Sequence, residues 1–256
     1  MTDKGLLRKR FSGACGSYEQ EATVQKAAAA ELASIIREQV PDGFRDKVLE
    51  VGCGTGVLTR ELLGFIPPEG LYLNDICPEF SSMFTDTGTA GFIAGDAETV
   101  DFPSGLGLIA SASAIQWFSD PGAFFRKCHR SLREGGYLAF STFGPGNLRE
   151  TARVSGQALR YLAPDELEAM LSLGYRTIQV SDYLSTLHFP TPADVLRHLK
   201  RTGVNGLSRR KWTRKDLSDF CRTYSELFGT AGGCTLTYHP VFVLARKQQD
   251  TPETRI

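Results

Sequence analysis

Residues 48–56 read VLEVGCGTG, and this stretch decides the fold class of the 256-residue chain. Its first four residues are apolar apart from Glu50, which is typical of a buried parallel strand. Three glycines follow at alternate positions, Gly52, Gly54 and Gly56. Glycine allows a sharp turn and lets a ligand lie directly against the backbone. The stretch therefore predicts a strand, a glycine-rich turn and then a helix.

The glycine spacing distinguishes two kinds of nucleotide site. A dinucleotide loop needs G-x-G-x-x-G, whereas here the third glycine comes one residue early and Val57 follows it. The carboxylate of Glu50 would repel a pyrophosphate and would suit a cationic ligand. The pattern resembles the first motif of the seven-stranded methyltransferases that use S-adenosylmethionine (SAM), whose sulfonium is cationic. A nicotinamide oxidoreductase remains the alternative for this motif.

Strand and helix patterns alternate along residues 47–143. We expect strands at 47–51, 71–75, 91–94, 106–111 and 137–143, and helices at 56–63, 78–84 and 120–132. Such alternation predicts a parallel sheet with helices on both faces and ligands at the carboxyl ends of the strands. Together with the resemblance, it predicts an α/β fold: a seven-stranded, mostly parallel, doubly wound (Rossmann-like) sheet with an inserted helical lid.

The chain is predicted to form a single methyltransferase domain over residues 1–256 with three elaborations. Residues 1–40 are basic and then helical, with a helix at 18–39, and we interpret them as a cap. The helical segments 145–160 and 190–230 are additional to the helices that connect the strands of the sheet, and we interpret them as a lid over the cofactor pocket. An extended segment at 176–189 and a last strand at 235–246 complete the pattern, and a polar tail at 248–256 is expected to be disordered.

Acidic residues end the next two predicted strands. Asp75 comes 19 residues after Gly56, where a carboxylate can accept hydrogen bonds from both ribose hydroxyls, unless it is only a turn residue. Asn74 beside it is a second polar contact or a turn residue. Asp96 can accept the adenine amino group while the amide of Ala97 meets a ring nitrogen; an N-cap role for Asp96 is the alternative.

The fourth predicted strand ends in residues that suit the other end of the cofactor. Ser111 ends the apolar run and is expected to open into the pocket. Gln116 and Trp117 lie where a floor for the sulfonium and the methionine part is needed, although Trp117 is equally suited to the core. No nucleophile triad appears, and methyl transfer needs none, because alignment and exclusion of water suffice for an activated methyl group.

Composition limits the partners and the compartment. The chain has 29 basic and 29 acidic residues, and a net charge of zero argues against nucleic acid as a general partner. Its six cysteines show no C-x-x-C pair and no metal-ligand spacing, so we expect free thiols, no metal and a reducing, cytoplasmic location. The first residues lack the apolar stretch of a signal peptide. The sequence also contains no apolar run of 18 residues, so we expect no membrane span.

Five further segments resemble one family over nearly the whole chain, the malonyl-acyl-carrier-protein O-methyltransferases of biotin synthesis. The segments are RFSGACGSYEQEATVQ (10–25), SASAIQWFSDP (111–121), FSTFGPGNLRE (140–150), DVLRHLKRTGVNG (194–206) and LTYHPVFVLARK (236–247). The resemblance implies methylation of the free carboxylate of malonyl carried on acyl carrier protein, giving the ester that starts pimeloyl synthesis. The chain departs from the family at 13–16, where Gly-Ala-Cys-Gly replaces a more usual alanine-rich run.

Two other functions remain open at this point. The first is a SAM-dependent methyltransferase that acts on a small free acid or a quinone precursor. The second is a non-catalytic module that binds SAM and docks an acidic protein.

A carboxylate acceptor is already anionic, so it needs no general base but only a group that holds its second oxygen. We name Tyr18, Arg149 and Arg197 as the candidate catalytic residues, with core packing as the alternative for Tyr18. His198 either assists these residues in holding the substrate carboxylate or lies on a helix surface. The aromatic residues Phe143, Trp212 and Tyr238 are pocket walls or ordinary packing.

Basic residues concentrate in one part of this neutral chain. Residues 197–215 contain no Asp or Glu and eight Lys or Arg, namely Arg197, Lys200, Arg201, Arg209, Arg210, Lys211, Arg214 and Lys215. A second basic stretch lies within residues 4–10. An acidic protein such as an acyl carrier protein would be attracted to such a surface. A solvated helical face is the alternative.

Overall fold

The computed structural model describes residues 3–41, 44–157, 159–203 and 212–248, and only the backbone of 14, 15 and 17–20. The chain divides into two compact units. The larger unit comprises Gln25–Thr142, Ala163–Ser181 and Val241–Ile256. The smaller unit comprises Met1–Val24, Phe143–Leu162 and Asp182–Pro240.

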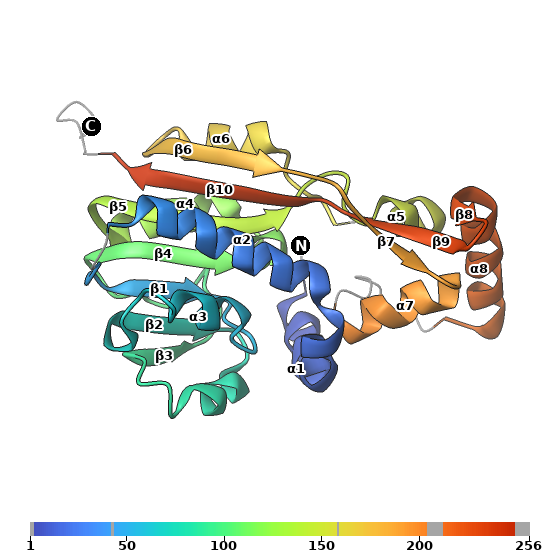
Figure 1. Ribbon diagram of the computed structural model, residues 1–256, viewed down its shortest axis with the longest axis horizontal. Helices are drawn as coiled ribbons and strands as arrows, with labels where there is room; N and C mark the ends of the chain where they lie inside the picture. The colour runs from blue at the N-terminus through green and yellow to red at the C-terminus, as the bar shows by residue number, and fades with distance from the viewer. Residues whose placement is uncertain (1–2, 42–43, 158, 204–211, 249–256) are drawn as a thin grey trace. The chain divides into compact units, whose positions relative to one another are not determined.

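The larger unit is built on a seven-stranded sheet with the order β3-β2-β1-β4-β5-β10-β6. Its strands are β1 (Val48–Val51), β2 (Leu71–Asp75), β3 (Gly91–Ala94), β4 (Leu106–Ala112), β5 (Leu132–Phe143), β6 (Tyr175–Asp182) and β10 (Pro240–Lys247). The pairs β1–β2, β1–β4, β2–β3 and β4–β5 are parallel. Figure 1 shows β10 running against its neighbours. The predicted seven-stranded, mostly parallel sheet is confirmed.

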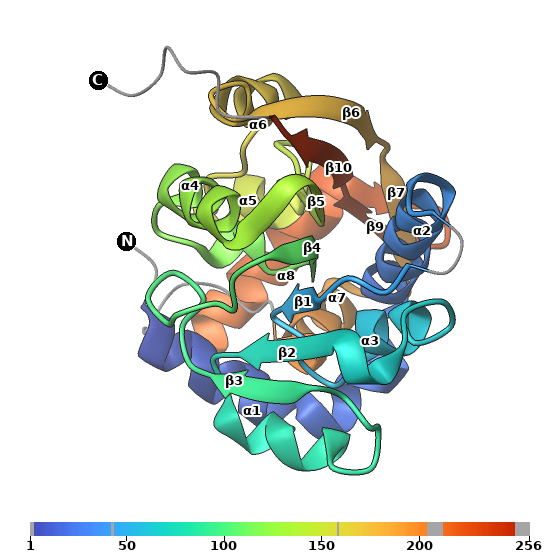
Figure 2. The same ribbon diagram turned by 90° about the vertical axis from the view of Figure 1, so that its left-hand side faces the viewer.

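Helices cover both faces of this sheet, as expected for central strands such as β1, in which all four residues are buried. Figure 2 shows α4 (Pro121–Ser131) on one face and α2 (Thr23–Gln39) with α3 (Val57–Leu62) on the other. Helix α6 (Pro164–Leu171) contacts α4. Three 3₁₀ turns, η1 (Pro68–Gly70), η2 (Pro78–Phe84) and η3 (Ile115–Trp117), complete the unit, so the helix predicted at 78–84 is the tighter 3₁₀ form.

The sequence of α4 explains where the helix begins and which of its faces is buried. The Asp120 carboxylate accepts a hydrogen bond from the Ala123 amide at 2.8 Å, and Pro121 occupies the first helical position. Phe124, Phe125 and Cys128 are spaced along one face and are buried. This face anchors the helix to the sheet, and its first turn faces the carboxyl ends of the strands.

The smaller unit has a sheet of its own. Strands β7 (Ser185–Phe189), β9 (Gly233–Tyr238) and β8 (Gly229–Thr230) pair antiparallel in that order. Its helices are α1 (Lys4–Glu21), α5 (Arg149–Ser155), α7 (Pro192–Arg201) and α8 (Arg214–Phe228). Both predicted lid segments, 145–160 and 190–230, belong to this unit, together with an antiparallel sheet that the sequence analysis did not anticipate.

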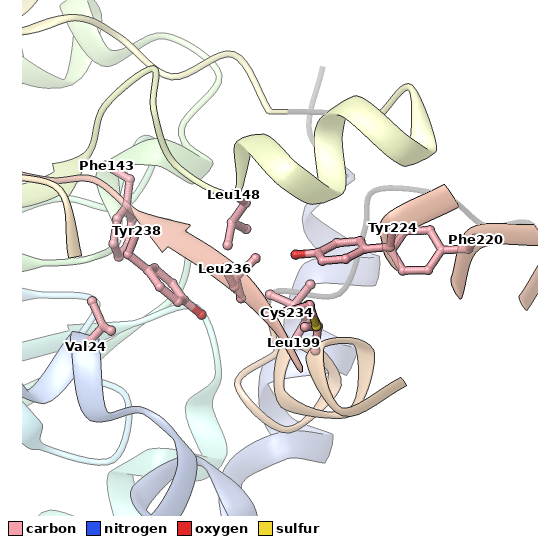
Figure 3. Packing of buried hydrophobic residues seen from close by; sticks show 10 residues of the cluster. Val24, Phe143, Leu148, Leu199, Phe220, Tyr224, Cys234, Leu236 and Tyr238 are labelled. Atoms are coloured by element: carbon pink, nitrogen blue, oxygen red, sulfur yellow. The ribbon is translucent and has the colours of Figure 1, made fainter. Parts of the chain in front are cut away.

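A separate hydrophobic core holds the smaller unit together. Figure 3 shows Leu148, which directly precedes α5, Leu199 of α7 and Tyr224 of α8 converging around Leu236 of β9. Tyr224 and Leu236 are fully buried, and the Tyr224 hydroxyl donates a hydrogen bond to the Thr235 carbonyl at 2.7 Å. Such a core allows the unit to keep its own fold.

Several other element predictions also differ from the structure. The helix expected at 18–39 is two helices that meet at Ala22, and the first of them begins at Lys4. The extended segment 176–189 is divided into β6 and β7, and the last strand is divided at His239. Most of the predicted tail, 249–256, lies outside the described residues. Among the helices that are described, none is both long and apolar enough to cross a membrane.

Candidate cofactor site and substrate residues

The glycine-rich turn after β1 has left-handed backbone at all three predicted glycines, with φ of 72° at Gly52, 52° at Gly54 and 84° at Gly56. A Cβ atom added at Gly52 would lie 2.7 Å from the Ala114 Cβ, and one at Gly56 would lie 2.8 Å from the Phe84 ring. At Gly54 no described atom lies within 4 Å of the added Cβ. Gly52 and Gly56 therefore permit close packing, whereas Gly54 borders open space.

Asp75 ends β2 directly beside this turn. One carboxylate oxygen accepts the backbone N–H of Gly54 at 2.9 Å and the other accepts that of Cys77 at 2.8 Å. Burial raises the pKa of Asp75, and these two hydrogen bonds oppose the shift. Each carboxylate oxygen has a second lone pair, so the group can still accept hydroxyl hydrogen bonds. This geometry suits the predicted ribose contact.

Glu50 is directed toward the helix that follows the turn. Its side chain is buried, and one carboxylate oxygen accepts a hydrogen bond from the Thr59 hydroxyl of α3 at 2.7 Å. Burial raises its pKa to about 8. Burial therefore favours the protonated form of Glu50, which weakens the electrostatic attraction to a cation that the sequence suggested.

Two other predicted contacts, Asn74 and Ser111, join strands to one another. The Asn74 amide group donates to the carbonyls of Ile93 at 2.7 Å and Gly95 at 3.0 Å. The Ser111 hydroxyl is fully buried and donates to the Val51 carbonyl at 2.9 Å. Both side chains thus brace the carboxyl edge of the sheet, and Ser111 faces β1.

Asp96 and Ala97 begin a short turn after β3. The Asp96 carboxylate accepts the Glu98 amide at 3.0 Å, the capping interaction that the sequence left as an alternative. Ala97 is buried, and its carbonyl accepts a hydrogen bond from the Lys127 ammonium at 2.7 Å. The turn is therefore fixed in place next to the end of β3.

Gln116 and Trp117 lie in η3, after β4. The Gln116 amide group donates to the Ser113 carbonyl at 2.6 Å, and its oxygen accepts from the Thr142 hydroxyl at 3.3 Å. Trp117 is buried, with 8% of its surface exposed. Both residues therefore follow the carboxyl end of β4, and the hydrogen bond from Thr142 connects Gln116 to β5.

Three hydroxyl groups at this edge were missed by the sequence analysis. The side-chain oxygens of Thr55, Ser113 and Ser141 are buried and have no hydrogen-bond partner among the described residues. Ser113 also has a left-handed backbone with φ of 55°, which is unusual for a residue other than glycine. Buried polar atoms are almost always paired, so these hydroxyls indicate a polar ligand or water at the site. They fit the amino-acid part of SAM, and the space at Gly54 fits its nucleoside.

The candidate substrate residues belong to the smaller unit. Arg149 is exposed, and its guanidinium lies 3.6 Å from the buried carboxylate of Glu150. Glu150 accepts hydrogen bonds from the amide of Thr237 at 3.0 Å and from its hydroxyl at 2.5 Å. Arg197 is exposed and forms an ion pair with Asp194, one turn earlier in α7. The side chain of Tyr18 lies outside the described residues.

His198 is buried in the smaller unit and is not a surface residue. Its Nε2 atom lies 2.9 Å from the Tyr238 hydroxyl, and its Nδ1 atom lies 3.6 Å from the Glu21 carboxylate. Burial lowers the pKa of His198 despite the carboxylate. Tyr238 also packs against Phe143, with ring centroids 5.9 Å apart, whereas Trp212 is partly exposed and packs against Phe220. Phe143 and Tyr238 therefore belong to the core of this unit.

Comparison with known proteins decides the family. The family model "Methyltransferase domain" matches residues 49–140. A malonyl-[acyl-carrier protein] O-methyltransferase of Bacteroides thetaiotaomicron is 41% identical over 260 residues, which cover 96% of this chain and 99% of that protein. The chain belongs to the malonyl-[acyl-carrier protein] O-methyltransferase family. It is therefore a SAM-dependent methyltransferase.

Two further similarities extend this result. A Bacteroides fragilis protein with the same name is 42% identical over 250 residues, which cover 96% of this chain but only 51% of that protein, so this chain spans about half its length. A solved structure of Haemonchus contortus phosphoethanolamine N-methyltransferase 2, in complex with phosphomonomethylethanolamine and S-adenosylhomocysteine, has a TM-score of 0.53 at 17% identity. It covers 86% of this chain and 52% of that one. This second similarity supports the fold alone.

In this family member, the basic cluster is only partly neutralised. Arg201 pairs with Glu21 at 2.6 Å, and Arg197 pairs with Asp194. Lys200, Arg214 and Lys215 are exposed, and residues 209–211 lie outside the described part of the chain. Five cysteines are free thiols, and within the described ranges no group of three or more His, Cys, Asp or Glu side chains is arranged to hold a metal.

Proposed function

We propose that the enzyme transfers a methyl group from SAM to the free carboxylate of malonyl carried on acyl carrier protein. The products are the malonyl methyl ester, which would start pimeloyl and biotin synthesis, and S-adenosylhomocysteine. The observation that carries the proposal is the open space at Gly54 beside Asp75, in a chain whose relatives are named for this reaction.

The carboxyl ends of β1 to β5 would hold the cofactor. Asp75 would accept the ribose hydroxyls, and the turn that begins at Asp96 and Ala97 would meet the adenine. The unpaired hydroxyls of Thr55, Ser113 and Ser141 would meet the amino-acid part. When bound, SAM supplies a methyl group that its sulfonium has already activated.

The transfer itself makes small demands on the protein. A carboxylate oxygen of the malonyl group forms a bond to the methyl carbon as the bond from that carbon to sulfur breaks, and the electron pair stays on sulfur. Because the acceptor is an anion, no proton has to be removed. The protein contributes alignment and exclusion of water. Tyr18, Arg149 and Arg197 are our candidates for holding the second carboxylate oxygen, and the exposed guanidiniums of the two arginines support this role.

An acidic acyl carrier protein would dock on the basic 197–215 segment. The exposed side chains of Lys200, Arg214 and Lys215 support this role, because they present positive charge on α7 and α8. We also propose a cytoplasmic location, which five free thiols support.

A methyl-transfer assay with labelled SAM tests the proposal. Malonyl-, succinyl- and acetyl-acyl carrier protein are compared with malonyl-coenzyme A. We expect label on the malonyl carrier protein, released by mild ester hydrolysis, and none on the acetyl form, which has no free carboxylate. If SAM binds but none of these acceptors is labelled, the substrate assignment is wrong, and small free acids and quinone precursors become the acceptors to test.

A further inference from the structure

The segment 96–100, which follows β3, forms a single helical turn. The Asp96 carbonyl accepts the amides of Thr99 and Val100, both at 2.9 Å, and the Asp96 carboxylate accepts the amide of Glu98 at 3.0 Å. Asp96 therefore caps the start of the turn with its side chain and accepts the hydrogen bonds that complete the turn with its carbonyl. The position of Asp96 and Ala97 therefore depends on what holds this turn as a whole.

Lys127 of α4 holds the far end of the turn. Its ammonium donates hydrogen bonds to the carbonyls of Ala97, at 2.7 Å, and Val100, and it lies 3.9 Å from the centroid of the Phe102 ring. A cation next to the last carbonyls of a helical turn is favourable, because these groups carry partial negative charge. Lys127 is half-buried, and this burial lowers the pKa of its ammonium.

Glu98 holds the same turn from the opposite side. Its two carboxylate oxygens accept the Ser119 amide at 3.0 and 2.9 Å, and one of them also accepts the Asp120 amide at 2.8 Å. These amides lie at the start of α4, where the helix dipole favours a negative charge. Because the segment just before them contains Gln116 and Trp117, Glu98 joins the turn to a second part of the candidate site.

We propose that Lys127 and Glu98 are positioning residues for recognition of the adenine of SAM. This inference rests on the proposed function, in which Asp96 and Ala97 contact the adenine. Lys127 and Glu98 act through the turn: together they fix the Asp96 carboxylate and the Ala97 amide relative to α4. Loss of either side chain would reduce the preference for a base that carries the adenine amino group more than it would reduce the affinity for the rest of the cofactor.

Binding measurements on Lys127→Met test this without turnover. Calorimetry gives the dissociation constants of S-adenosylhomocysteine and of S-inosylhomocysteine, whose base has a keto group in place of the amino group. We expect the dissociation constant of the adenosyl ligand to rise about tenfold in the variant, which corresponds to the loss of one charged hydrogen bond. The dissociation constant of the inosyl ligand should rise less. Lys127→Arg should restore much of the difference, because a guanidinium can donate to both carbonyls. The control is Arg126→Met, an exposed neighbour on the same helix.

The outcomes separate a positioning role from a merely structural one. Equal weakening of both ligands, or unchanged binding of both, would overturn the inference, as would a wild-type enzyme that does not distinguish them. Glu98→Gln, which keeps one carbonyl acceptor, provides the same comparison if Lys127→Met does not fold, with a smaller expected loss. If the wild type binds S-adenosylhomocysteine selectively but methylates no malonyl acceptor, the proposed substrate is wrong, while the proposed adenine contact and this inference stand.

Discussion

The carboxylate of Asp75 at the end of β2 accepts the backbone N–H of Gly54 at 2.9 Å, across 21 residues of sequence. Its other oxygen accepts the N–H of Cys77. One side chain therefore fixes the glycine turn and remains able to accept hydrogen bonds from a ligand. The proposed ribose contact and the shape of the turn therefore depend on the same group.

Asp75→Ala should weaken SAM binding by about 1–3 kcal/mol, because buried ribose hydroxyls lose their acceptor. Asp75→Asn should not rescue binding, since its NH₂ group would face the N–H of either Gly54 or Cys77. Calorimetry with SAM checks both variants, and Asp86→Ala, an exposed acid after η2, is the control. Wild-type affinity in Asp75→Ala would place the ribose contact elsewhere.

Gly54→Val should abolish detectable SAM binding, because the side chain would enter the open space at the turn. Valine at φ of 52° is also strained, so the control must carry the same strain. Gly105→Val supplies it: Gly105 has φ of 71° and open space around the added Cβ, and it precedes β4 at the opposite edge of the sheet. Similar destabilisation of both variants with binding lost only in Gly54→Val is the expected result. SAM binding by folded Gly54→Val would contradict it.

Glu50 should make the enzyme less stable as the pH rises from about 5 to 8. Burial raises its folded-state pKa to about 8 from 4.5, so in this range the folded state keeps a proton that the unfolded chain loses. Glu50→Gln cannot ionise, so its stability relative to wild type should increase with pH, by at most about 1.4 kcal/mol per pH unit. Urea unfolding from pH 5 to 9 measures this difference. A difference that does not vary with pH would contradict the assignment.

Local signals were sufficient for much of the larger unit. Strands β2 and β3 have the predicted bounds, because each is a short apolar run closed by a residue that suits a turn. Strand β5 was predicted to start at 137 but begins at Leu132. The pair Gly135–Gly136 indicated a helix end, whereas the structure accommodates it in a register shift between the pairs Leu106–Leu132 and Leu108–Tyr137. Such an irregularity depends on the neighbouring strand.

The site shows the same division between local and long-range information. The glycines and Asp75 follow from local spacing, but Ser111 bonds to a carbonyl 60 residues away, which no local pattern contains. The unpaired hydroxyls of Ser113 and Ser141 are also recognisable only in three dimensions, since the absence of a partner is a property of the packing. The second sheet was missed because β7 and β9 pair residues that lie from 45 (Phe189 and Cys234) to 53 (Ser185 and Tyr238) positions apart, a separation that local patterns do not encode.

Tyr238→Phe should destabilise the smaller unit by about 1–2 kcal/mol, because buried His198 loses its hydrogen-bond partner. Burial lowers the folded-state pKa of His198, so its neutral form contributes stability that is lost as the pH falls below about 6.5. A double-mutant cycle with His198→Leu, measured by urea unfolding at pH 7.5, isolates the pair. Additive effects would show that the two side chains do not interact.

Charge reversal on α8 should weaken recognition of the carrier protein and spare the chemistry. Arg214→Glu with Lys215→Glu is expected to raise KM for malonyl-acyl carrier protein at least tenfold at low salt, since an acidic partner would meet negative charge. The rate with malonyl-coenzyme A at saturation should stay within about twofold, and the KM effect should shrink at high salt. Arg130→Glu with Arg176→Glu changes the net charge equally at exposed positions of the larger unit and is the control. Equal KM increases in the two double variants would indicate a general charge effect in place of docking on the basic segment.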